Sequence, residues 1–497
     1  MRMSFQRLLE GAEVLSQQGD PEITGLDYDS RRVRPGYVFV AMRGETTDGN
    51  RFIDKAIASG AVAVVTDSVS EAPRSNVAWA QVPHGRRALA RLSANFYKRP
   101  AEKLHITGIT GTNGKTTTTF ILESIFRSAG RKSVLVGTVE YHLPGEVLPA
   151  PHTTPESLEL NQMFGKAIGL GATEGVMEVS SHALAQQRVF AIPFDAAVFS
   201  NLTRDHLDYH GTMEDYLASK RILFEGSGTE PPRVAIGNID DEYGRQLLEF
   251  SRKRSPEVIS YGLDHGDFRA EKLDISPAGN RFDLVTPTGV VPLFSPMRGR
   301  VNVYNVLAAA AAAYARECSL DEIAKGVGSL ARVPGRFESV DEGQPFSVVV
   351  DYAHTDDALK NLTSLAREFV ARSGGRVLTV FGCGGDRDRA KRPMMGEAAG
   401  KGSDFVVLTS DNPRSEDPLV IINDALPGLQ RTQTKYVLEP DRRNAIAMAL
   451  GEANAGDIVL IAGKGHERTQ TTREGVFPFD DFEVARQELH KLGFQKS

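Results

Sequence analysis

The sequence predicts an α/β protein with three domains. Its 497 residues are more than one hydrophobic core normally organises, so three domains of ordinary size are the natural expectation. A glycine-rich loop at 108–117 lies between an apolar stretch and a helix-like stretch, and apolar strands alternate with helices toward the C-terminus. We expect a small α/β N-terminal domain (1–100), a central P-loop-type domain with a mostly parallel sheet (101–335) and a C-terminal Rossmann-like α/β domain (336–497).

Strand and turn signals mark each of these regions. The first holds short apolar strands at 36–41 and 60–65, and its last helix breaks at Lys98-Arg99-Pro100 because proline cannot continue a helix. The second begins with the glycine-rich loop and ends near Val333-Pro334-Gly335. The strands expected in the third are 346–350, 377–381, 405–408 and 458–462.

The bulk composition is that of a globular protein, with 41% hydrophobic and 25% charged residues. A net charge of -6 gives no electrostatic reason to expect nucleic acid as a partner. Two cysteines, Cys318 and Cys383, are too few for a disulfide framework, which fits a reducing compartment.

The N-terminus lacks the apolar core of a signal peptide. The longest apolar run, 306–315, is too short for a bilayer and indicates a buried helix. We therefore expect a cytoplasmic protein without a membrane span.

The glycine-rich loop has the composition of a phosphate-binding loop. Glycines let its backbone N–H groups point at phosphate oxygens, and the N-terminus of the next helix adds partial positive charge. We expect Lys115 to reach the terminal phosphates of a nucleoside triphosphate and the Thr116 hydroxyl to ligate Mg²⁺. The strict pattern GxxxxGK(S/T) fails because its first glycine is replaced by Ile109. A tight turn without function is the alternative, but the Gly-Lys-Thr ending between a strand and a helix favours phosphate binding.

Polar clusters follow apolar strands at six places in the central and C-terminal regions. Ligands of parallel α/β sheets bind beyond the carboxyl ends of the strands. Six clusters in two regions therefore predict two sheets that face a shared cleft. The clusters are 115–116, 178, 351, 386–387, 411–414 and 463–467.

Glu178 and His206 are candidate metal ligands. Glu178 follows a buried strand and can hold Mg²⁺ beside the loop, although a solvated strand end is the alternative. His206 and His210 stand four residues apart, which could suggest zinc, but acidic surroundings without cysteine make zinc a weak interpretation. The other interpretation is that His206 helps at a magnesium site.

Lys220 lies on the apolar face of a predicted helix. Helical spacing places Tyr216, Leu223 and Phe224 on the same face. A lysine on an inward face loses hydration, so its pKa should fall. Extension to solvent is the usual outcome for such a side chain. The reactive alternative is that the neutral amine takes up CO₂ and becomes a carbamate, an anion able to ligate magnesium.

The last region supplies groups for a nucleotide and for an acidic ligand. Arg336, Asp351 and His354 are placed to reach a nucleotide across the cleft. The glycines at 382–385 do not complete a GxGxxG fingerprint, so the arginines after them are interpreted as carboxylate binders. Arg414 ends a rigid Asp-Asn-Pro-Arg turn that suits bidentate carboxylate recognition. Two arginines and an acid indicate a site for an amino acid with more than one carboxylate: Arg387, Arg414 and Glu467.

These strings together resemble the Mur ligases, nearly end to end. The matching strings are 111–117, 153–155, 178–182, 205–211, 302–305, 382–388, 411–414 and 463–467. The resemblance implies a cytoplasmic, monomeric ligase that uses ATP and Mg²⁺. Its implied reaction joins meso-diaminopimelate to the D-glutamate γ-carboxylate of UDP-N-acetylmuramoyl-L-alanyl-D-glutamate through an acyl phosphate. It also implies that Lys220 is the carbamylated lysine of this family.

The resemblance assigns roles to individual residues. Catalysis is implied for Lys115, Glu178, His206 and Lys220, and Mg²⁺ binding for Thr116, Glu178, His206 and Lys220. ATP contacts are implied for Gly111, Thr112, Asn113, Gly114, Lys115, Thr116, Thr117, Asn305, Arg336, Asp351 and His354. The UDP end would contact Ser30, Glu45, Thr46 and Thr47, and the muramoyl-dipeptide Thr153, Thr154, Ser180, Gln186 and Arg188. The diaminopimelate site would comprise Arg387, Asp411, Asn412, Pro413, Arg414, Gly463 and Glu467.

Two points leave alternatives open. Where the family has His-Thr-Pro-Asp, this chain has Asp356 in place of the proline, which should loosen a helix start although aspartate there is favourable. Lysine lacks the distal carboxylate of diaminopimelate, and a guanidinium at Arg414 favours diaminopimelate.

Competing functions are a folylpolyglutamate synthetase, a P-loop ATPase or kinase, and a catalytically silent binding protein.

Overall fold

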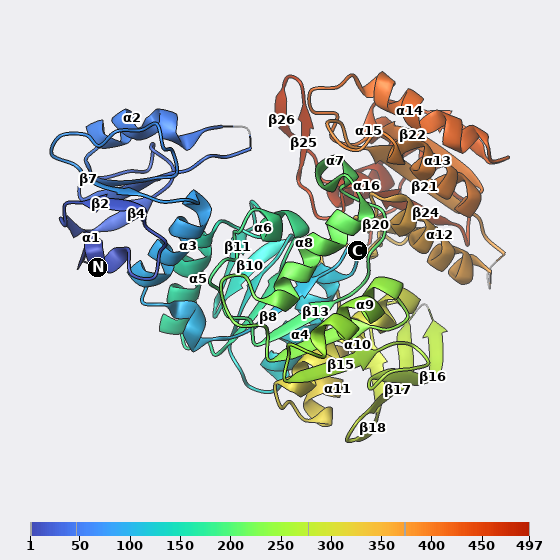
Figure 1. Cartoon of the computed structure of the whole chain (residues 1–497). Helices are drawn as coiled ribbons and strands as arrows, with labels where there is room; N and C mark the ends of the chain where they lie inside the picture. Colours follow the sequence, from blue (N-terminus) through green and yellow to red (C-terminus); the bar gives the residue numbers. More distant parts are fainter. Residues whose placement is uncertain (1, 46, 277, 372–373, 497) are drawn as a thin grey trace.

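The computed structural model describes residues 2–45, 47–276, 278–371 and 374–496. Figure 1 shows three lobes in chain order, each built around its own β-sheet, which confirms the predicted α/β class.

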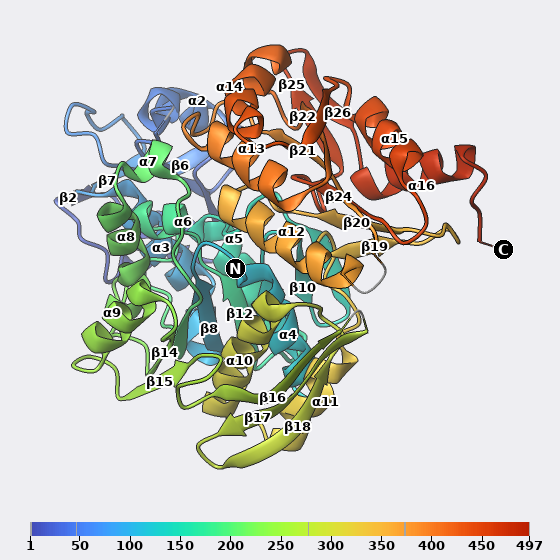
Figure 2. The same ribbon diagram turned by 90° about the vertical axis from the view of Figure 1, so that its right-hand side faces the viewer.

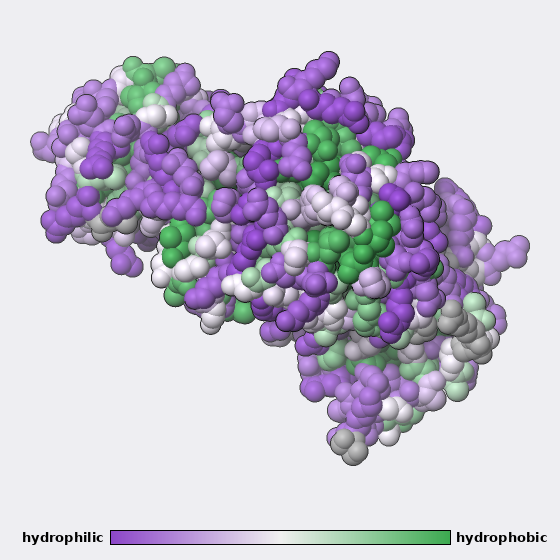
Figure 3. Space-filling view, turned by 90° about the horizontal axis from the view of Figure 1, so that it is seen from below, coloured by the Kyte–Doolittle hydropathy of each residue, from purple (hydrophilic) through white to green (hydrophobic). Residues whose placement is uncertain are grey.

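In the space-filling view of Figure 3, hydrophilic side chains cover most of the visible face and hydrophobic ones form separate patches. Among the described residues, no helix has the length and apolar character needed to cross a bilayer. The residue boundaries of the domains stay a prediction.

The first lobe contains a five-stranded sheet with the order β2-β7-β6-β5-β4, in which only β2 runs antiparallel. The predicted strands at 36–41 and 60–65 are confirmed as β5 and β6. Lys98 and Arg99 both have positive φ, so the chain turns away before Pro100. The elements are β1 (Met3–Ser4), α1 (Phe5–Leu8), β2 (Ser16–Gln18), β3 (Glu22–Ile23), β4 (Gly25–Asp27), β5 (Tyr37–Ala41), η1 (Gly49–Phe52), α2 (Ile53–Ala58), β6 (Ala61–Thr66), β7 (Ala78–Gln81), α3 (Gly85–Phe96) and η2 (Pro100–Lys103).

The central lobe contains an eight-stranded sheet with the order β11-β10-β9-β12-β8-β13-β14-β15. Strands β9 to β15 are parallel apart from the β10–β11 hairpin, and β8, which leads into the glycine-rich loop, lies between β12 and β13. The elements are β8 (His105–Thr110), α4 (Lys115–Ser128), β9 (Ser133–Val136), β10 (Glu140–Leu143), β11 (Glu146–Pro149), α5 (Ser157–Gly169), β12 (Glu174–Glu178), α6 (Ser181–Ala185), β13 (Ala196–Phe199), α7 (Leu207–His210), α8 (Met213–Glu225), β14 (Val234–Asn238), α9 (Glu242–Ser251), β15 (Glu257–Tyr261), α10 (Arg300–Ala315) and α11 (Leu320–Ser329).

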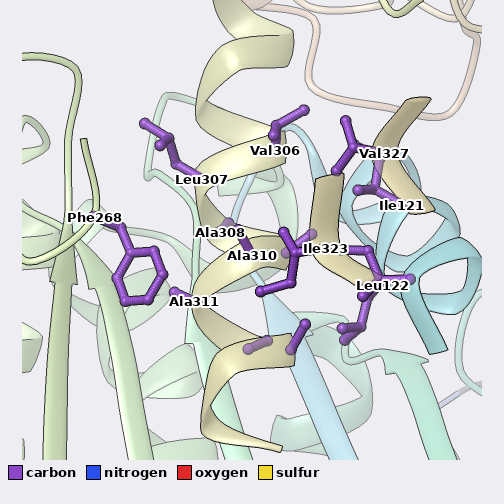
Figure 4. Close-up of a cluster of buried hydrophobic side chains, with 14 of the residues drawn as sticks. Ile121, Leu122, Phe268, Val306, Leu307, Ala308, Ala310, Ala311, Ile323 and Val327 are labelled. Carbon is purple, nitrogen blue, oxygen red and sulfur yellow. The ribbon is translucent and has the colours of Figure 1, made fainter. Parts of the chain in front are cut away.

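A three-stranded antiparallel sheet, which the sequence analysis did not predict, follows the central sheet. It comprises β16 (Arg269–Ser276), β17 (Gly279–Thr286) and β18 (Gly289–Ser295), and it lies beside α10 and α11 in Figure 2. Helix α10 is the buried helix expected at 306–315. Its alanines allow α4, α11 and Phe268 to pack closely around it, as Figure 4 shows.

The C-terminal lobe contains a six-stranded sheet with the order β19-β20-β24-β21-β22-β23, parallel except for β19. All four predicted strands are confirmed, as β20, β21, β22 and β24, whereas β19, β23 and the β25–β26 hairpin were not predicted. The elements are β19 (Glu338–Val340), β20 (Ser347–Asp351), α12 (Asp356–Val370), β21 (Val377–Cys383), α13 (Lys391–Gly402), β22 (Phe405–Ser410), α14 (Pro418–Gln430), β23 (Lys435–Leu438), α15 (Arg442–Glu452), β24 (Ile458–Ala462), β25 (Thr469–Thr472), β26 (Gly475–Pro478) and α16 (Asp481–Lys491).

Candidate active site

A cavity of about 560 Å³ lies between the central and C-terminal lobes. The glycine-rich loop and Glu178 line it from the carboxyl edge of the central sheet, and Asp351 and His354 line it from the end of β20. Three of the six predicted polar clusters therefore meet in one cleft. The clusters at 386–387, 411–414 and 463–467 do not line this cavity. Within the C-terminal lobe, Asn412 contacts Glu467, and Asp386 contacts Ser415, which directly follows the cluster at 411–414.

Two glycines fix the path of the phosphate loop. Gly111 and Gly114 have φ values of +146° and +87°, in the region that side chains rarely adopt. A Cβ atom at Gly111 would lie 1.9 Å from Ser200 Oγ, and one at Gly114 would lie 2.3 Å from Asn305 Oδ1. The loop thus packs against Ser200 and Asn305, and glycine is required at both positions although the strict pattern is not met.

The ammonium groups of Lys115 and Lys220 lie beside the same loop carbonyl. Lys115 Nζ donates to the Gly111 and Thr112 carbonyl oxygens, at 2.9 and 2.8 Å, and Lys220 Nζ donates to the Gly111 carbonyl oxygen at 2.9 Å. Burial lowers the pKa of Lys115. Burial, together with repulsion from Lys115, brings the pKa of Lys220 well below the usual lysine value. The shift is larger for Lys220, whose amine is thereby biased toward the neutral, nucleophilic form.

Helix α8 buries Lys220 as its spacing predicted. Tyr216, Leu223 and Phe224 are buried on the same face, and the Lys220 side chain is only 1% exposed. Its Nζ lies 4.4 Å from the centre of the Tyr216 ring. Extension to solvent is therefore wrong for Lys220, because the amine ends inside the protein against a carbonyl and an aromatic ring.

Glu178 is buried at the end of β12, so the alternative of a solvated strand end is wrong. Its two carboxylate oxygens accept hydrogen bonds from the backbone N and the hydroxyl of Thr138, at 2.8 and 2.9 Å. The Thr138 hydroxyl also lies 3.1 Å from the Thr153 hydroxyl. Thr138 thus fixes the orientation of Glu178 at the cavity wall.

His206 lies in a left-handed turn, with φ of 55°, next to a buried carboxylate that contacts the C-terminal lobe. Its Nε2 is 3.4 Å from Asp205 Oδ2, while Asp205 also reaches Lys391 Nζ at 3.4 Å and His354 Nε2 at 3.9 Å. Burial lowers the pKa of His206 below the usual histidine value, although the neighbouring Asp205 carboxylate opposes this shift. The ring is therefore neutral near pH 7, which is the form that ligates metals.

His210 is engaged elsewhere. Its Nε2 lies 2.9 Å from Ser181 Oγ and its Nδ1 lies 3.3 Å from Ser219 Oγ, while its ring stacks on Tyr216. Within the described ranges, no group of three or more His, Cys, Asp or Glu side chains is arranged to hold a metal ion. The contacts of His210 give no support to a zinc site shared with His206.

The residues expected to contact nucleotide converge on the phosphate loop. Arg336 Nη2 donates to Thr116 Oγ1 at 3.1 Å, and its guanidinium lies over the Tyr352 ring. Asp351 accepts from the backbone N atoms of Phe337 and Ala353, and burial raises its pKa. Asn305 accepts from the Thr118 hydroxyl at 3.4 Å.

The start of α12 is formed although the expected proline is absent. Thr355 caps the helix by accepting from Ala358 N, and Asp356 and Asp357 occupy its first turn. Asp357 Oδ2 also accepts from Asn113 Nδ2 at 3.0 Å, so this helix start contacts the phosphate loop. The helix start is thus formed and capped without the proline, and the looser start expected from its loss stays a prediction.

The residues expected at the muramoyl-dipeptide are close together. Arg188 donates to Gln186 Oε1, at 3.0 Å from Nε and 2.7 Å from Nη2, and to the Thr154 carbonyl at 3.0 Å. Ser180 N donates to Thr154 Oγ1. Gln186 Nε2 in turn donates to Glu45 Oε1 of the first lobe at 2.7 Å, so the first lobe reaches this site. Of the other first-lobe residues, Ser30 is buried, Thr47 lies in the same loop as Glu45, and Thr46 lies outside the described residues.

Arg387 and Arg414 form a cationic site in the C-terminal lobe. Arg414, with φ of 53°, donates to the Gly385 carbonyl at 2.7 Å, and Arg387 donates to the Asp386 carbonyl at 3.1 Å. Among the described residues, no carboxylate lies within salt-bridge distance of either guanidinium. Burial, with repulsion from Arg387, lowers the pKa of Arg414. Two guanidinium groups that form no ion pair within 4.0 Å among the described residues make a site for an anionic ligand.

Other members of the predicted amino-acid site surround the Asn412 side chain. Asn412 Nδ2 donates to Glu467 Oε2 at 2.7 Å. A Cβ at Gly463 would lie 2.8 Å from Asp411 Oδ2, so glycine lets the chain pass close to that carboxylate. Arg389, which the sequence analysis also interpreted as a carboxylate binder, pairs with Asp424 of the protein itself.

Several residues of the site were missed by the sequence analysis. Lys464 is fully buried between Asn412 and Glu467, and Lys391 reaches Asp205 across the cleft. Lys464 directly follows an apolar strand and one glycine, a position that could have indicated burial. Thr138 and Lys391 carry no comparable signal, because their partners lie far away in the sequence.

Comparisons with known proteins agree with this arrangement over nearly the whole chain. Three family models match: "Mur ligase family, catalytic domain" over residues 22–97, "Mur ligase middle domain" over 109–313 and "Mur ligase, glutamate ligase domain" over 335–465. A protein of Solibacter usitatus named UDP-N-acetylmuramoyl-L-alanyl-D-glutamate--2,6-diaminopimelate ligase is 53% identical over 477 residues, which cover 96% of this chain and 95% of the relative.

Solved structures show the same similarity. A structure titled as a UDP-N-acetylmuramoyl-L-alanyl-D-glutamate--2,6-diaminopimelate ligase matches with a TM-score of 0.68 and 34% identity, covering 99% of this chain and all of that one. The MurF ligase of Thermotoga maritima in complex with ADP matches with a TM-score of 0.64 and 20% identity, over 94% of this chain and 98% of that one. At that identity the second match shows a common fold.

Proposed function

The chain belongs to the Mur ligase family, and from that premise we propose that it adds meso-2,6-diaminopimelate to UDP-N-acetylmuramoyl-L-alanyl-D-glutamate. The bond formed is an amide at the D-glutamate γ-carboxylate, and ATP is consumed. The observation that carries this choice of amino acid is the pair of guanidinium groups at Arg387 and Arg414, which donate to backbone carbonyls and form no ion pair within 4.0 Å among the described residues. Diaminopimelate has a distal carboxylate for them, and lysine has none.

The reaction needs activation of a carboxylate. The γ-phosphoryl group of ATP is transferred to a γ-carboxylate oxygen, which gives an acyl phosphate and ADP. A neutral amine of diaminopimelate attacks the carbonyl carbon, the carbon–phosphate oxygen bond breaks, and phosphate leaves while the nitrogen loses a proton. The cavity between two lobes can keep the acyl phosphate from water.

The phosphate loop would bind ATP through its backbone and through Lys115. Because Lys115 now donates to two loop carbonyls, it must turn toward the terminal phosphates when ATP binds. The remaining ATP contacts are proposed for residues that already surround the loop: Gly111, Thr112, Asn113, Gly114, Thr116, Thr117, Asn305, Arg336, Asp351 and His354.

Magnesium fits the donor types present in the cavity. Three of them line the cavity: the Thr116 hydroxyl, the buried carboxylate of Glu178 and the neutral ring of His206. The fourth would be a carbamate formed on Lys220, whose Nζ lies behind the phosphate loop against the Gly111 carbonyl oxygen. Carbamate formation joins the neutral Lys220 amine to CO₂ and releases one proton. Bound Mg²⁺ would neutralise charge on the ATP phosphates during transfer.

The substrate is proposed to span all three lobes. The UDP end would contact Ser30, Glu45, Thr46 and Thr47 of the first lobe. The muramoyl-dipeptide would contact Thr153, Thr154, Ser180, Gln186 and Arg188. Diaminopimelate would bind among Arg387, Asp411, Asn412, Pro413, Arg414, Gly463 and Glu467. Because these substrates are cytosolic precursors of peptidoglycan, we assign the protein to the cytoplasm, and we expect it to act as a monomer without nucleic acid.

Phosphate release tests this proposal directly. The protein is incubated with ATP, Mg²⁺ and UDP-N-acetylmuramoyl-L-alanyl-D-glutamate, with meso-diaminopimelate or L-lysine in parallel, and the product is identified by mass. Turnover only with diaminopimelate is expected. Turnover with lysine alone would contradict the role of the guanidinium pair. ATP hydrolysis independent of any amino acid would instead favour an ATPase or kinase.

A further inference from the structure

Lys464 is a buried cation to which the proposed reaction assigns no role. It follows β24 after a single residue, Gly463, and its side chain is fully buried. Its Nζ donates to Asn412 Oδ1 at 3.2 Å and to Glu467 Oε2 at 3.0 Å, and it lies 3.8 Å from Asp411 Oδ1. Every one of these partners belongs to the proposed amino-acid site.

The Lys464 ammonium fixes the orientation of the Asn412 amide. Asn412 Oδ1 accepts from Lys464 Nζ and from the backbone N of Thr471 at 2.9 Å. The amide nitrogen is therefore turned toward Glu467 Oε2, to which it donates at 2.7 Å. Without Lys464, one of the two donors that hold this orientation is lost.

The same contacts leave one oxygen of Glu467 available. Glu467 Oε2 accepts from both Asn412 and Lys464, whereas Oε1 accepts no hydrogen bond from any residue in the described part of the chain. The carboxylate is thus held by one oxygen and presents the other to a ligand. A carboxylate held in this way suits an ammonium group.

Lys464 also sets the charge of the site. Arg414 is acted on by Arg387 and by three carboxylates, Asp411, Glu467 and Asp386. Lys464 is the cation that lies within 4.0 Å of two of these carboxylates, Asp411 and Glu467. Diaminopimelate brings two ammonium and two carboxylate groups, whereas lysine brings two ammonium groups and one carboxylate. Each additional cation in the site repels ammonium groups. It therefore disfavours lysine, which has one more ammonium group than carboxylates. Removing Lys464 would leave two neighbouring carboxylates partly unpaired, a surrounding that favours lysine.

We propose that Lys464 is a positioning and specificity residue of the amino-acid site. It holds Glu467 and Asn412 for one ammonium group of diaminopimelate, and its charge disfavours lysine. This inference rests on the proposed function.

The first test is Lys464→Met, with KM measured separately for each substrate. We expect the KM for diaminopimelate to rise on the order of tenfold to a hundredfold, with the KM values for ATP and the nucleotide substrate within about twofold. The preference for diaminopimelate over lysine should fall about tenfold. Lys401→Met is the matched control, because Lys401 lies in the same lobe with its side chain 70% exposed. An unchanged KM for diaminopimelate, or an equal rise in every KM, would overturn the inference.

A double-mutant cycle separates positioning from general stability. If Lys464 acts through Glu467, its removal in a Glu467→Gln background should change the KM for diaminopimelate by no more than about twofold. Effects that multiply independently would contradict the inference. Should Lys464→Met fail to fold, Lys464→Gln removes the charge and keeps a hydrogen-bond donor on a shorter side chain, and the same loss of preference is expected. The wild-type arm distinguishes the two proposals, because absence of turnover with diaminopimelate there defeats the proposed function itself.

Discussion

Lys115 and Lys220 donate to one acceptor, the carbonyl oxygen of Gly111, each at 2.9 Å. Two ammonium groups so close repel each other, which adds to the effect of burial on the pKa of Lys220. Conversion of Lys220 to a carbamate would replace this repulsion by attraction. The arrangement therefore favours a modified Lys220 beside a cationic Lys115.

Lys220→Ala should lower kcat by about a hundredfold or more, because the proposed carbamate and its charge are lost. Short carboxylates such as acetate should partly restore the rate by standing in for the carbamate. Steady-state phosphate release with and without acetate is the measurement. Lys401→Ala is the control, and a fully active Lys220→Ala protein would exclude the carbamate role.

Arg414→Ala should raise the KM for diaminopimelate about thirtyfold to a thousandfold, because a charged ligand group loses its partner. The KM values for ATP and the nucleotide substrate should change little. Arg389→Ala is a matched control, since Arg389 lies in the same lobe but pairs with Asp424 at the surface. Unchanged selectivity in Arg414→Ala would contradict the proposed amino-acid site.

Gly114→Ala should abolish ATP binding or destabilise the fold, because its Cβ would lie 2.3 Å from Asn305 Oδ1. Gly145→Ala separates crowding from backbone strain, since Gly145 has a similar φ of +84° with nothing within 4 Å of its Cβ. We expect Gly145→Ala to cost about 1 kcal/mol of unfolding free energy and Gly114→Ala clearly more. Thermal unfolding and ATP titration compare the two, and equal effects would show that crowding against Asn305 is unimportant.

His142 should make stability depend on pH. Its ring lies between Glu123 of α4, at 2.8 Å, and Glu140, at 2.9 Å. Burial alone lowers its pKa, but these two carboxylates outweigh burial and raise it. A raised folded-state pKa gives stability that is complete below the unfolded value of about 6.5 and is lost as pH rises through the folded value. The stability difference between wild type and His142→Gln should thus be larger at pH 6 than at pH 8, and a difference that grows with pH would contradict this account.

The sequence predicted those features that depend on local periodicity. Helical spacing was enough to place Lys220 on a buried face, and a glycine loop between a strand and a helix was enough to place Lys115. Contacts between distant segments could not be predicted in this way. The pairing of Arg389 with Asp424 and of Lys391 with Asp205 depends on how lobes and helices pack, and a single sequence does not specify that packing.

The missed strands have a similar cause. Strands β16 and β17 interleave charged residues with apolar ones, and Pro292 interrupts the apolar run of β18. They therefore differ from the uninterrupted apolar runs by which the parallel strands were recognised. Strand β23 is exposed along its whole length at the sheet edge. A continuous apolar run identifies a central strand in the sequence, whereas the formation of an edge strand depends on pairing with the neighbouring strand.

The hydrogen bond between Gln186 and Glu45 means that binding of the nucleotide substrate is an exchange of partners. If these residues contact the substrate as proposed, each must first leave the other, so part of every new interaction replaces an old one. The measured affinity for the nucleotide substrate then reflects a difference in free energy between two states. In one, Gln186 and Glu45 bond to each other, and in the other both contact the substrate. A substrate fragment that cannot engage both lobes would gain little, and discrimination against incomplete precursors would arise at the first step of recognition.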